Sequence, residues 1–195
     1  MHGLINRAIQ CFVRDTYGAN RWIAVTRRAQ LDFTEFEAML HYEDKVTEDL
    51  VTAISAEMSL PKRVVLEDIG TYLASHENVE AVRRLLRFSG ATFLEFLHSL
   101  DDLQARARLA LADLDMPKLE LHDHGENQFS LQCLHEMGGF SYVVMGVLRT
   151  MADDYGALVL LEHAESRPDR EIIHIQLVEQ AYSAGRQFNL GAKTA

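Results

Sequence analysis

Cysteine, proline and long apolar runs are scarce in this chain, which has 195 residues but only 2 Cys and 3 Pro. Cys11 and Cys133 form neither a CxxC pair nor a disulfide framework, so we expect both thiols to be reduced. No run of about 18 apolar residues is present, and the amino terminus lacks the charged-then-apolar pattern of a secretory signal. These absences argue against a disulfide scaffold and a membrane-spanning protein, and they predict a cytoplasmic protein.

Positive charge is also in short supply. Lys and Arg number 19 against 29 Asp and Glu, and the resulting net charge of −10 repels the phosphate backbone of nucleic acids. One local basic cluster, Arg83, Arg84 and Arg87, lies on a predicted helix, and we interpret it as a solvated helix face. The hydrophobic fraction of 48% is typical of a globular domain. We therefore predict a single domain of ordinary size that binds neither nucleic acid nor membrane.

Motifs for catalysis are missing as well. The chain has no Ser/His/Asp constellation, no glycine-rich phosphate loop and no paired acid and base carboxylates, so we predict that it is not an enzyme. Among its 9 histidines, His122 and His124 are the only close pair. Alternate residues of a strand share a face, so this pair could bind Zn²⁺ if His135 on the neighbouring strand completed the site. Solvated hairpin side chains are the preferred explanation.

Apolar residues recur at helical spacing through the first ~110 residues. Helices are predicted over residues 3–15, 44–58, 61–73 and 79–86, and a shorter one around Trp22. Residues 31–42 have a mixed pattern, which we interpret as a strand or turn. The amino-terminal part of the chain is therefore expected to be helical.

The strongest local signal is a capping box, Thr92 followed by Glu95, which predicts the start of a helix. The apolar stripe of this helix continues to Ala107 and fades before Pro117. Gln104 falls on the same stripe. A polar side chain on an inward face must find a partner, and we expect a backbone group to supply it.

After Pro117 the pattern changes from helical to alternating, which predicts a hairpin of two strands around a turn at residues 123–127. A helix begins at Phe140, with Gly156 just past its end, and two strands follow at residues 158–163 and 172–178. The predicted fold class is α+β, with a helical amino-terminal part followed by a four-stranded antiparallel sheet that has one helix inserted. We assign residues 1–180 to one domain and residues 181–195 to a carboxy-terminal tail.

Several segments of this chain are similar to one known family. The runs "FLEFLHSLDDLQARARL", "MPKLEL" and "GGFSYVVMGVLRTMADDYG" resemble the heme nitric oxide/oxygen-binding (H-NOX) family, which includes the amino-terminal domain of the soluble guanylate cyclase β subunit. The opening "MHGLINRAIQCFVRDTYGANRW" resembles the first two helices of the family, so the likeness covers roughly residues 1–178. The resemblance implies an H-NOX fold, a heme cofactor and a role in signalling.

The family's iron ligand is replaced in this chain. In the family a histidine in a segment resembling "LDxLH" ligates the heme iron, and the matching "LDDLQ" places Gln104 there. A glutamine amide is a poor iron ligand compared with imidazole. By the same resemblance, Pro117 matches the proline that presses on the porphyrin, and Ile5 matches a position that lines the pocket above it.

The family motif Tyr-x-Ser-x-Arg, which holds the heme propionates, is also absent. The matching positions are Cys133, His135 and Met137 in "CLHEM". Losing arginine removes the bidentate guanidinium that best pairs with carboxylates. Heme is therefore the cofactor that the resemblance implies, but these substitutions predict that it is not bound in the family's manner.

The resulting hypothesis is a heme-free regulatory protein of the H-NOX type that works through protein contact or senses another ligand. By resemblance, its partner would be a histidine kinase or a diguanylate cyclase, and a homodimer is compatible with it. Two alternatives stay open. One is a true NO/O₂ sensor with His135 as a substitute iron ligand, and the other is a zinc-responsive or structural partner protein that uses the hairpin histidines.

Overall fold

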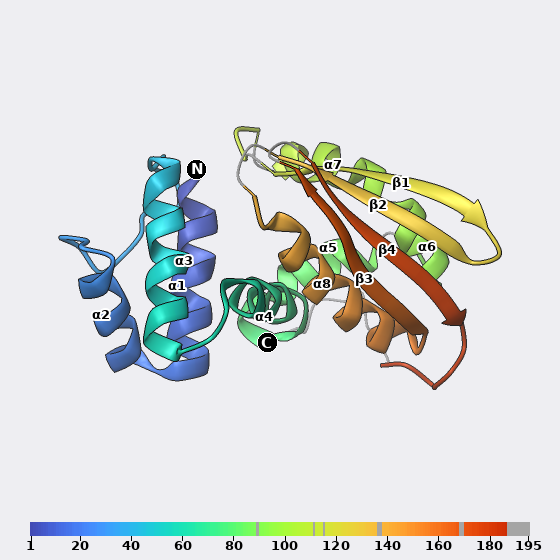
Figure 1. The fold of residues 1–195 in the computed structure, drawn as a ribbon, viewed down its shortest axis with the longest axis horizontal. Coiled ribbons are helices and arrows are strands. Elements are labelled where there is room, and N and C mark those ends of the chain that lie inside the picture. The colour runs from blue at the N-terminus through green and yellow to red at the C-terminus, as the bar shows by residue number, and fades with distance from the viewer. Residues whose placement is uncertain (89, 111, 115, 136–137, 168–169, 187–195) are drawn as a thin grey trace, which may run out of the picture.

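Helices fill the first half of the chain, and a four-stranded sheet with one long helix fills most of the second (Figure 1). The computed structural model describes residues 1–88, 90–110, 112–114, 116–135, 138–167 and 170–186. The first helices are α1 (Gly3–Tyr17), α2 (Ala19–Arg28), α3 (Asp44–Met58), α4 (Lys62–Ser75) and α5 (Glu80–Arg87), with a 3₁₀ turn η1 (Glu77–Val79) before α5. They are followed by α6 (Phe93–His98), the 3₁₀ turn η2 (Leu100–Asp102), α7 (Leu103–Ala110), β1 (Lys118–Gly125), β2 (Gln128–Leu134), α8 (Phe140–Tyr155), β3 (Leu158–Arg167) and β4 (Arg170–Glu179).

The helices expected in the amino-terminal part are confirmed, whereas the segment 31–42 contains no extended strand. Its only ladder contact is an isolated antiparallel bridge between His41 and His2. Hydrogen bonds from Gly3 N to Leu40 O (2.7 Å) and from Tyr42 N to Met1 O (3.0 Å) flank this bridge. The segment is therefore a loop whose end is tied to the chain terminus.

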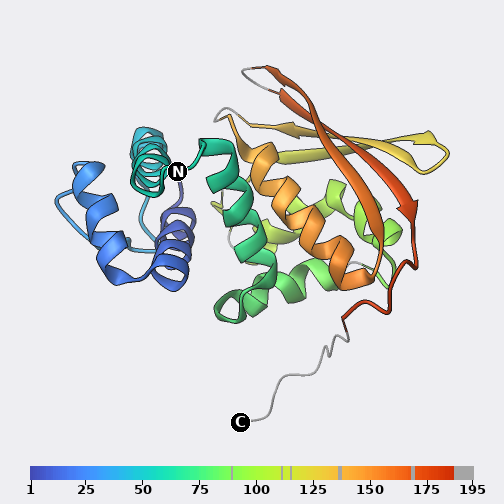
Figure 2. The ribbon, with the colours of Figure 1, turned by 60° about the horizontal axis from the view of Figure 1, so that its bottom comes forward.

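The sheet has the order β1-β2-β4-β3 with every neighbouring pair antiparallel, so the predicted α+β class is confirmed. The turn between β1 and β2 is tighter than expected. Glu126 and Asn127 both have positive φ (51° and 59°), as in the two-residue turn whose twist suits a hairpin. Helix α8 crosses one face of the sheet, and α4 lies beside α8 (Figure 2).

Among the described residues, the buried side chains form two hydrophobic clusters, one on each side of α4. The first joins α1 to α4 and includes Phe12, Trp22, Phe36, Leu50, Ile54 and Ile69. The second joins α6, α7, α8 and the sheet and includes Phe93, Leu97, Leu103, Leu131, Leu148 and Ile173. Helix α4 contributes side chains to both, so it connects the helical part to the sheet part.

Two glycines allow α4 and α8 to touch. A Cβ on Gly70 of α4 would collide with the carbonyl oxygen of Val143, and a Cβ on Gly146 of α8 would collide with that of Glu67. Because glycine has no side chain, the two backbones come into direct contact at the crossing.

The helix predicted from Thr92 begins as expected but does not run unbroken. Thr92 Oγ1 accepts from Glu95 N (3.2 Å), and the Glu95 carboxylate accepts from Thr92 N (3.3 Å), which completes the capping box. The Ser99 hydroxyl then donates to Phe96 O (2.6 Å), and the chain tightens into η2 before α7. A local hydroxyl-to-carbonyl bond of this kind competes with regular helix geometry.

The prediction of a solvated helix face is wrong for Arg83 and Arg87. Arg83 Nε donates to Asp154 Oδ2 at 2.7 Å, and the Asp154 side chain is buried. The Arg87 guanidinium lies 3.9 Å from the centre of the Tyr155 ring, within cation–π range. Both arginines therefore attach α5 to the end of α8.

The start of the predicted tail docks on the same end of α8. Ser183 N donates to Gly156 O (2.9 Å), and Arg186 N donates to Asp154 O (3.0 Å). Residues 187–195 lie outside the described part of the chain, and the domain division at residue 180 remains a prediction. Among the described residues, no helix combines the length and apolarity needed to span a bilayer.

Candidate functional site

Gln104 lies on the first turn of α7 and is half-buried. Its Nε2 donates to the carbonyl oxygen of Met116 at 2.7 Å, so a backbone group supplies the partner that this inward-facing amide needs. Pro117, directly after Met116, is buried where the chain enters β1. Gln104 and Pro117 therefore belong to one local structure, in which the side chain of α7 fastens the segment that leads into the sheet.

Cys133 lies on the inward face of β2, 2% exposed, and is paired with Leu119 of β1 and Glu171 of β4. Burial and, to a lesser extent, the Glu171 charge raise the pKa of the Cys133 thiol to about 12. The thiol is therefore protonated near neutral pH and is neither a nucleophile nor a good metal ligand.

Glu171 is a component of this site that our sequence reading did not select. It is 6% exposed at the start of β4, and its carboxylate accepts from Gly139 N (3.0 and 3.1 Å) and Ser141 N (3.0 Å). Gly139 precedes α8 with φ 98° and has no side chain to cap the helix. Glu171 thus supplies the anionic cap of α8 from a different element, which the helix dipole favours.

A signal for Glu171 is present in the sequence. Ile173, Ile175 and Leu177 alternate on the inward face of β4, and the same parity places Glu171 inward one step earlier. A charged residue at the end of an inward-facing series is an indication of a buried partner. We predicted this strand to begin at residue 172, and the shorter range left Glu171 out.

Three more positions were selected by resemblance: His135, Met137 and Ile5. His135 follows β2, is half-buried, and its ring centre lies 4.4 Å from that of Phe140. Met137 lies outside the described residues. Ile5 is half-buried on α1 and packs against the cluster of α1 to α4, whereas Cys133 belongs to the cluster on the sheet side.

The hairpin histidines are exposed. His124 Nε2 makes a 2.8 Å hydrogen bond with Ser130 Oγ of β2, which occupies one ring nitrogen. Within the described residues, His122 and His124 are not part of any group of three side chains close enough to hold a metal ion. The structure therefore gives the hairpin zinc hypothesis no third ligand in the part of the chain that it describes.

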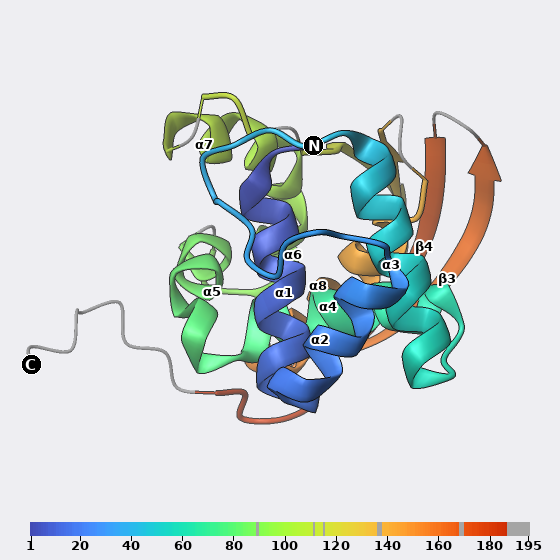
Figure 3. The same ribbon diagram turned by 90° about the vertical axis from the view of Figure 1, so that its left-hand side faces the viewer.

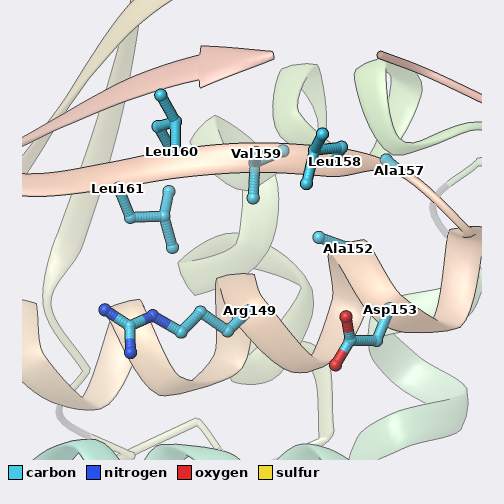
Figure 4. Close-up of a pocket in the computed structure, with 8 residues that line it drawn as sticks. All are labelled: Arg149, Ala152, Asp153, Ala157, Leu158, Val159, Leu160 and Leu161. Carbon is cyan, nitrogen blue, oxygen red and sulfur yellow. The ribbon is translucent and has the colours of Figure 1, made fainter. Parts of the chain in front are cut away.

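A groove of about 370 Å³ lies between α8 and the edge strand β3. Arg149 and Asp153 line its helix side, while Val159 and Leu161 point toward the helix and Leu160 points away from it (Figure 4). The groove contains one basic and one acidic side chain and none of the positions selected by resemblance.

The sequence matches the Haem-NO-binding family over residues 2–163. It is similar to soluble guanylate cyclase gcy-31 of Caenorhabditis elegans, with 22% identity over 176 residues that cover 90% of this chain and 25% of the relative. It is also similar to soluble guanylate cyclase 89Da of Drosophila melanogaster, with 21% identity over 170 residues that cover 87% and 26%. The chain thus spans about a quarter of the length of these curated relatives.

Solved structures show the same fold. An H-NOX protein from S. oneidensis superposes with a TM-score of 0.78 at 16% identity, covering 92% of this chain and 97% of the other. An unliganded Fe(II) H-NOX protein from K. algicida has a TM-score of 0.75 at 16% identity, covering 94% and 100%. The expected H-NOX architecture is therefore confirmed.

Proposed function

The chain belongs to the Haem-NO-binding family, and from this premise we propose that it is a regulatory sensor module that no longer holds heme and signals through protein contact. We propose no catalytic activity for it. It matches only about a quarter of each guanylate cyclase relative, and over that quarter it belongs to a family of sensor domains.

The observation that carries this proposal is the buried carboxylate of Glu171 beside Cys133. By resemblance, Cys133 stands where the family places the first residue of its propionate-holding motif. A heme propionate at that point would meet a carboxylate that already accepts the backbone N–H groups of Gly139 and Ser141. Two carboxylates close together in a buried site repel one another strongly. The residues present therefore do not fit a heme carboxylate.

The side of the site where iron would bind is equally unsuited. The Gln104 amide is held by its bond to Met116 O, and moving it toward a metal would leave that half-buried carbonyl without its donor. The protonated thiol of Cys133 offers no thiolate in its place.

For the partner we propose a histidine kinase or a diguanylate cyclase, with the module acting in the cytoplasm. Two free cysteines fit a reducing compartment. Capture of the tagged full chain from its source cells, followed by mass spectrometry, should enrich such an enzyme. Recovery of only membrane transport proteins or only chaperones would contradict this assignment.

The heme proposal is tested by an absorption spectrum of the full chain purified from heme-supplied cells, before and after addition of hemin. We expect no stoichiometric Soret band in either spectrum. A strong Soret band at about one heme per chain would overturn the proposal.

A gain-of-function series makes the test sharper. Gln104→His with Cys133→Tyr, His135→Ser and Met137→Arg restores the family's ligands, and adding Glu171→Gln removes the competing charge. If the missing ligands and the Glu171 charge prevent heme binding, heme affinity rises through the series and is highest when Glu171 is also replaced. Equal hemin affinity with and without Glu171→Gln would show that the carboxylate does not exclude the propionates.

A further inference from the structure

His2 and His41 face one another across the bridge that ties the loop after α2 to the chain terminus. They are directly opposed in an antiparallel pair, and their ring centres lie 5.1 Å apart with the planes at 74°. The backbone bonds from Gly3 to Leu40 and from Tyr42 to Met1 hold both sides of the bridge. The two imidazoles are therefore presented together by fixed backbone.

A carboxylate from a distant part of the chain completes the group. Asp113 lies in the segment between α7 and β1, and Figure 3 shows α7 at the same end of the molecule as the amino terminus. Its Oδ1 is 3.6 Å from His2 Nε2, and its Oδ2 is 3.7 Å from His41 Nε2. These distances are longer than direct hydrogen bonds but short enough for one ion to be shared.

His2 is the side chain that demands an explanation. It is 0% exposed, and its Nε2 has no hydrogen-bond partner among the described residues. Its other nitrogen, Nδ1, accepts from Leu4 N at 3.1 Å as the cap of α1, which orients the ring so that Nε2 is directed toward Asp113. Buried polar atoms in folded proteins are almost always satisfied.

We propose that His2, His41 and Asp113 bind a divalent transition-metal ion, with Zn²⁺ the best fit. One ligand atom from each residue lies within 4.8 Å of the others. Tetrahedral Zn²⁺ with bonds of about 2.0–2.2 Å keeps its donor atoms about 3.4 Å apart, so only a small closure of the group is needed. Two imidazoles and one carboxylate are a common donor set for zinc, and water takes the fourth position.

Binding requires a change in the protonation of His2. While Nδ1 accepts from Leu4 N, the proton of the neutral ring is on Nε2, which the metal must occupy. The proton moves from Nε2 to Nδ1, so the hydrogen bond from Leu4 N that caps α1 is lost and Nε2 becomes free to bind the metal. Losing such a cap lowers the affinity by roughly fivefold, a small loss beside the strength of structural zinc binding.

The position of the site suggests what the ion would do. His2 and His41 belong to the helical part, whereas Asp113 belongs to the segment whose far end Gln104 fastens through Met116 O. A bound ion would join the two parts at a second point, in addition to the α4–α8 crossing, and thereby help to fix their relative arrangement. This inference goes beyond the proposed function and does not depend on it, because none of the positions matching the family's heme pocket supplies a ligand.

The experiment is a Zn²⁺ titration of the full chain, without a histidine tag, in competition with a chromogenic chelator. A parallel titration with Co²⁺ reports tetrahedral geometry by its visible absorption. We expect one ion per chain. His41→Ala and Asp113→Asn should each weaken binding by more than about tenfold, the lower bound for losing even an outer-shell partner. Both side chains are 57% exposed, so neither variant should disturb folding.

The matched control is His122→Ala with His124→Ala, which removes the other close histidine pair and should leave the affinity unchanged. His2→Gln should abolish binding, but it also removes the α1 cap, so the two exposed positions carry the test. Wild-type affinity in both His41→Ala and Asp113→Asn would overturn the proposal. Loss of binding in the hairpin variant would overturn it too, and would move the ion to the hairpin.

Discussion

Replacing Glu171 with alanine tests the buried cap of α8 most directly. The change leaves two backbone donors without a partner, at Gly139 and at fully buried Ser141. An unsatisfied buried donor costs about 1–3 kcal/mol, and the lost interaction between charge and helix dipole adds about 1 kcal/mol. Since Gly139 is only half-buried, water can reach it, and we expect a total loss of about 3 kcal/mol.

Glu171→Gln should cost less, because the amide oxygen can still accept one of these bonds while the charge is lost. We expect a decrease of about 1–2 kcal/mol in the free energy of unfolding, dominated by the charge-assisted part of the cap. Equilibrium urea unfolding followed by circular dichroism measures both values. For a chain of this size, a loss of 3 kcal/mol lowers the midpoint of thermal unfolding by about 6–12 °C.

Glu162→Ala is the matched control, since Glu162 is exposed on the adjacent strand β3. A surface substitution of this kind should change stability by less than about 0.5 kcal/mol. If Glu171→Ala is as mild as this control, the cap is unimportant, and the argument that its carboxylate excludes heme propionates loses its support.

Three further predictions concern other parts of the molecule. Gly146→Ala should destabilise the protein by about 2 kcal/mol or more, because the new methyl group collides with α4. Gly138→Ala is the control and should be tolerated, since a methyl group there meets open space. Equal effects of the two variants on the urea midpoint would contradict the close crossing. The hydrogen bond from Tyr72 lowers the pKa of Asp15, so the carboxylate stabilises the fold above its unfolded pKa. Asp15→Asn should therefore cost about 1 kcal/mol at pH 7. In unfolding titrations the difference should shrink as pH falls below about 4, the pKa of an unfolded Asp, and disappear below the lowered pKa of the folded state; a constant difference would exclude the linkage. Iodoacetamide at pH 8 should label Cys133 only after unfolding, since burial raises the pKa of its thiol to about 12; mass spectrometry of the native protein would reveal any earlier reaction.

Much of the fold could be predicted from the sequence because its signals are local. The capping box at Thr92, the alternation after Pro117 and the glycine after α8 each act within a few residues, and the structure has a helix or strand at each place. The break at Ser99 could not be predicted from apolar periodicity, because the stripe continues through it. The hydroxyl bond from Ser99 to Phe96 O marks the break in the structure.

The candidate sites depend on contacts between residues that are distant in the sequence, and there the prediction is weaker. From the sequence alone, Arg83 is predicted to face solvent, but the tertiary structure places Asp154 against it. His2, His41 and Asp113 come from three separate segments with no metal-ligand spacing between them. His122 and His124 are selected on sequence because they lie two residues apart. The three-residue group is assembled by the tertiary structure at a different place.

The glycine crossing of α4 and α8 has a mechanical consequence. Side chains between two helices can usually change rotamer and so accommodate a small displacement. Two backbones in direct contact cannot adjust in this way. We therefore expect a displacement of α8 to move α4 with it, and α4 shares a hydrophobic cluster with the first three helices.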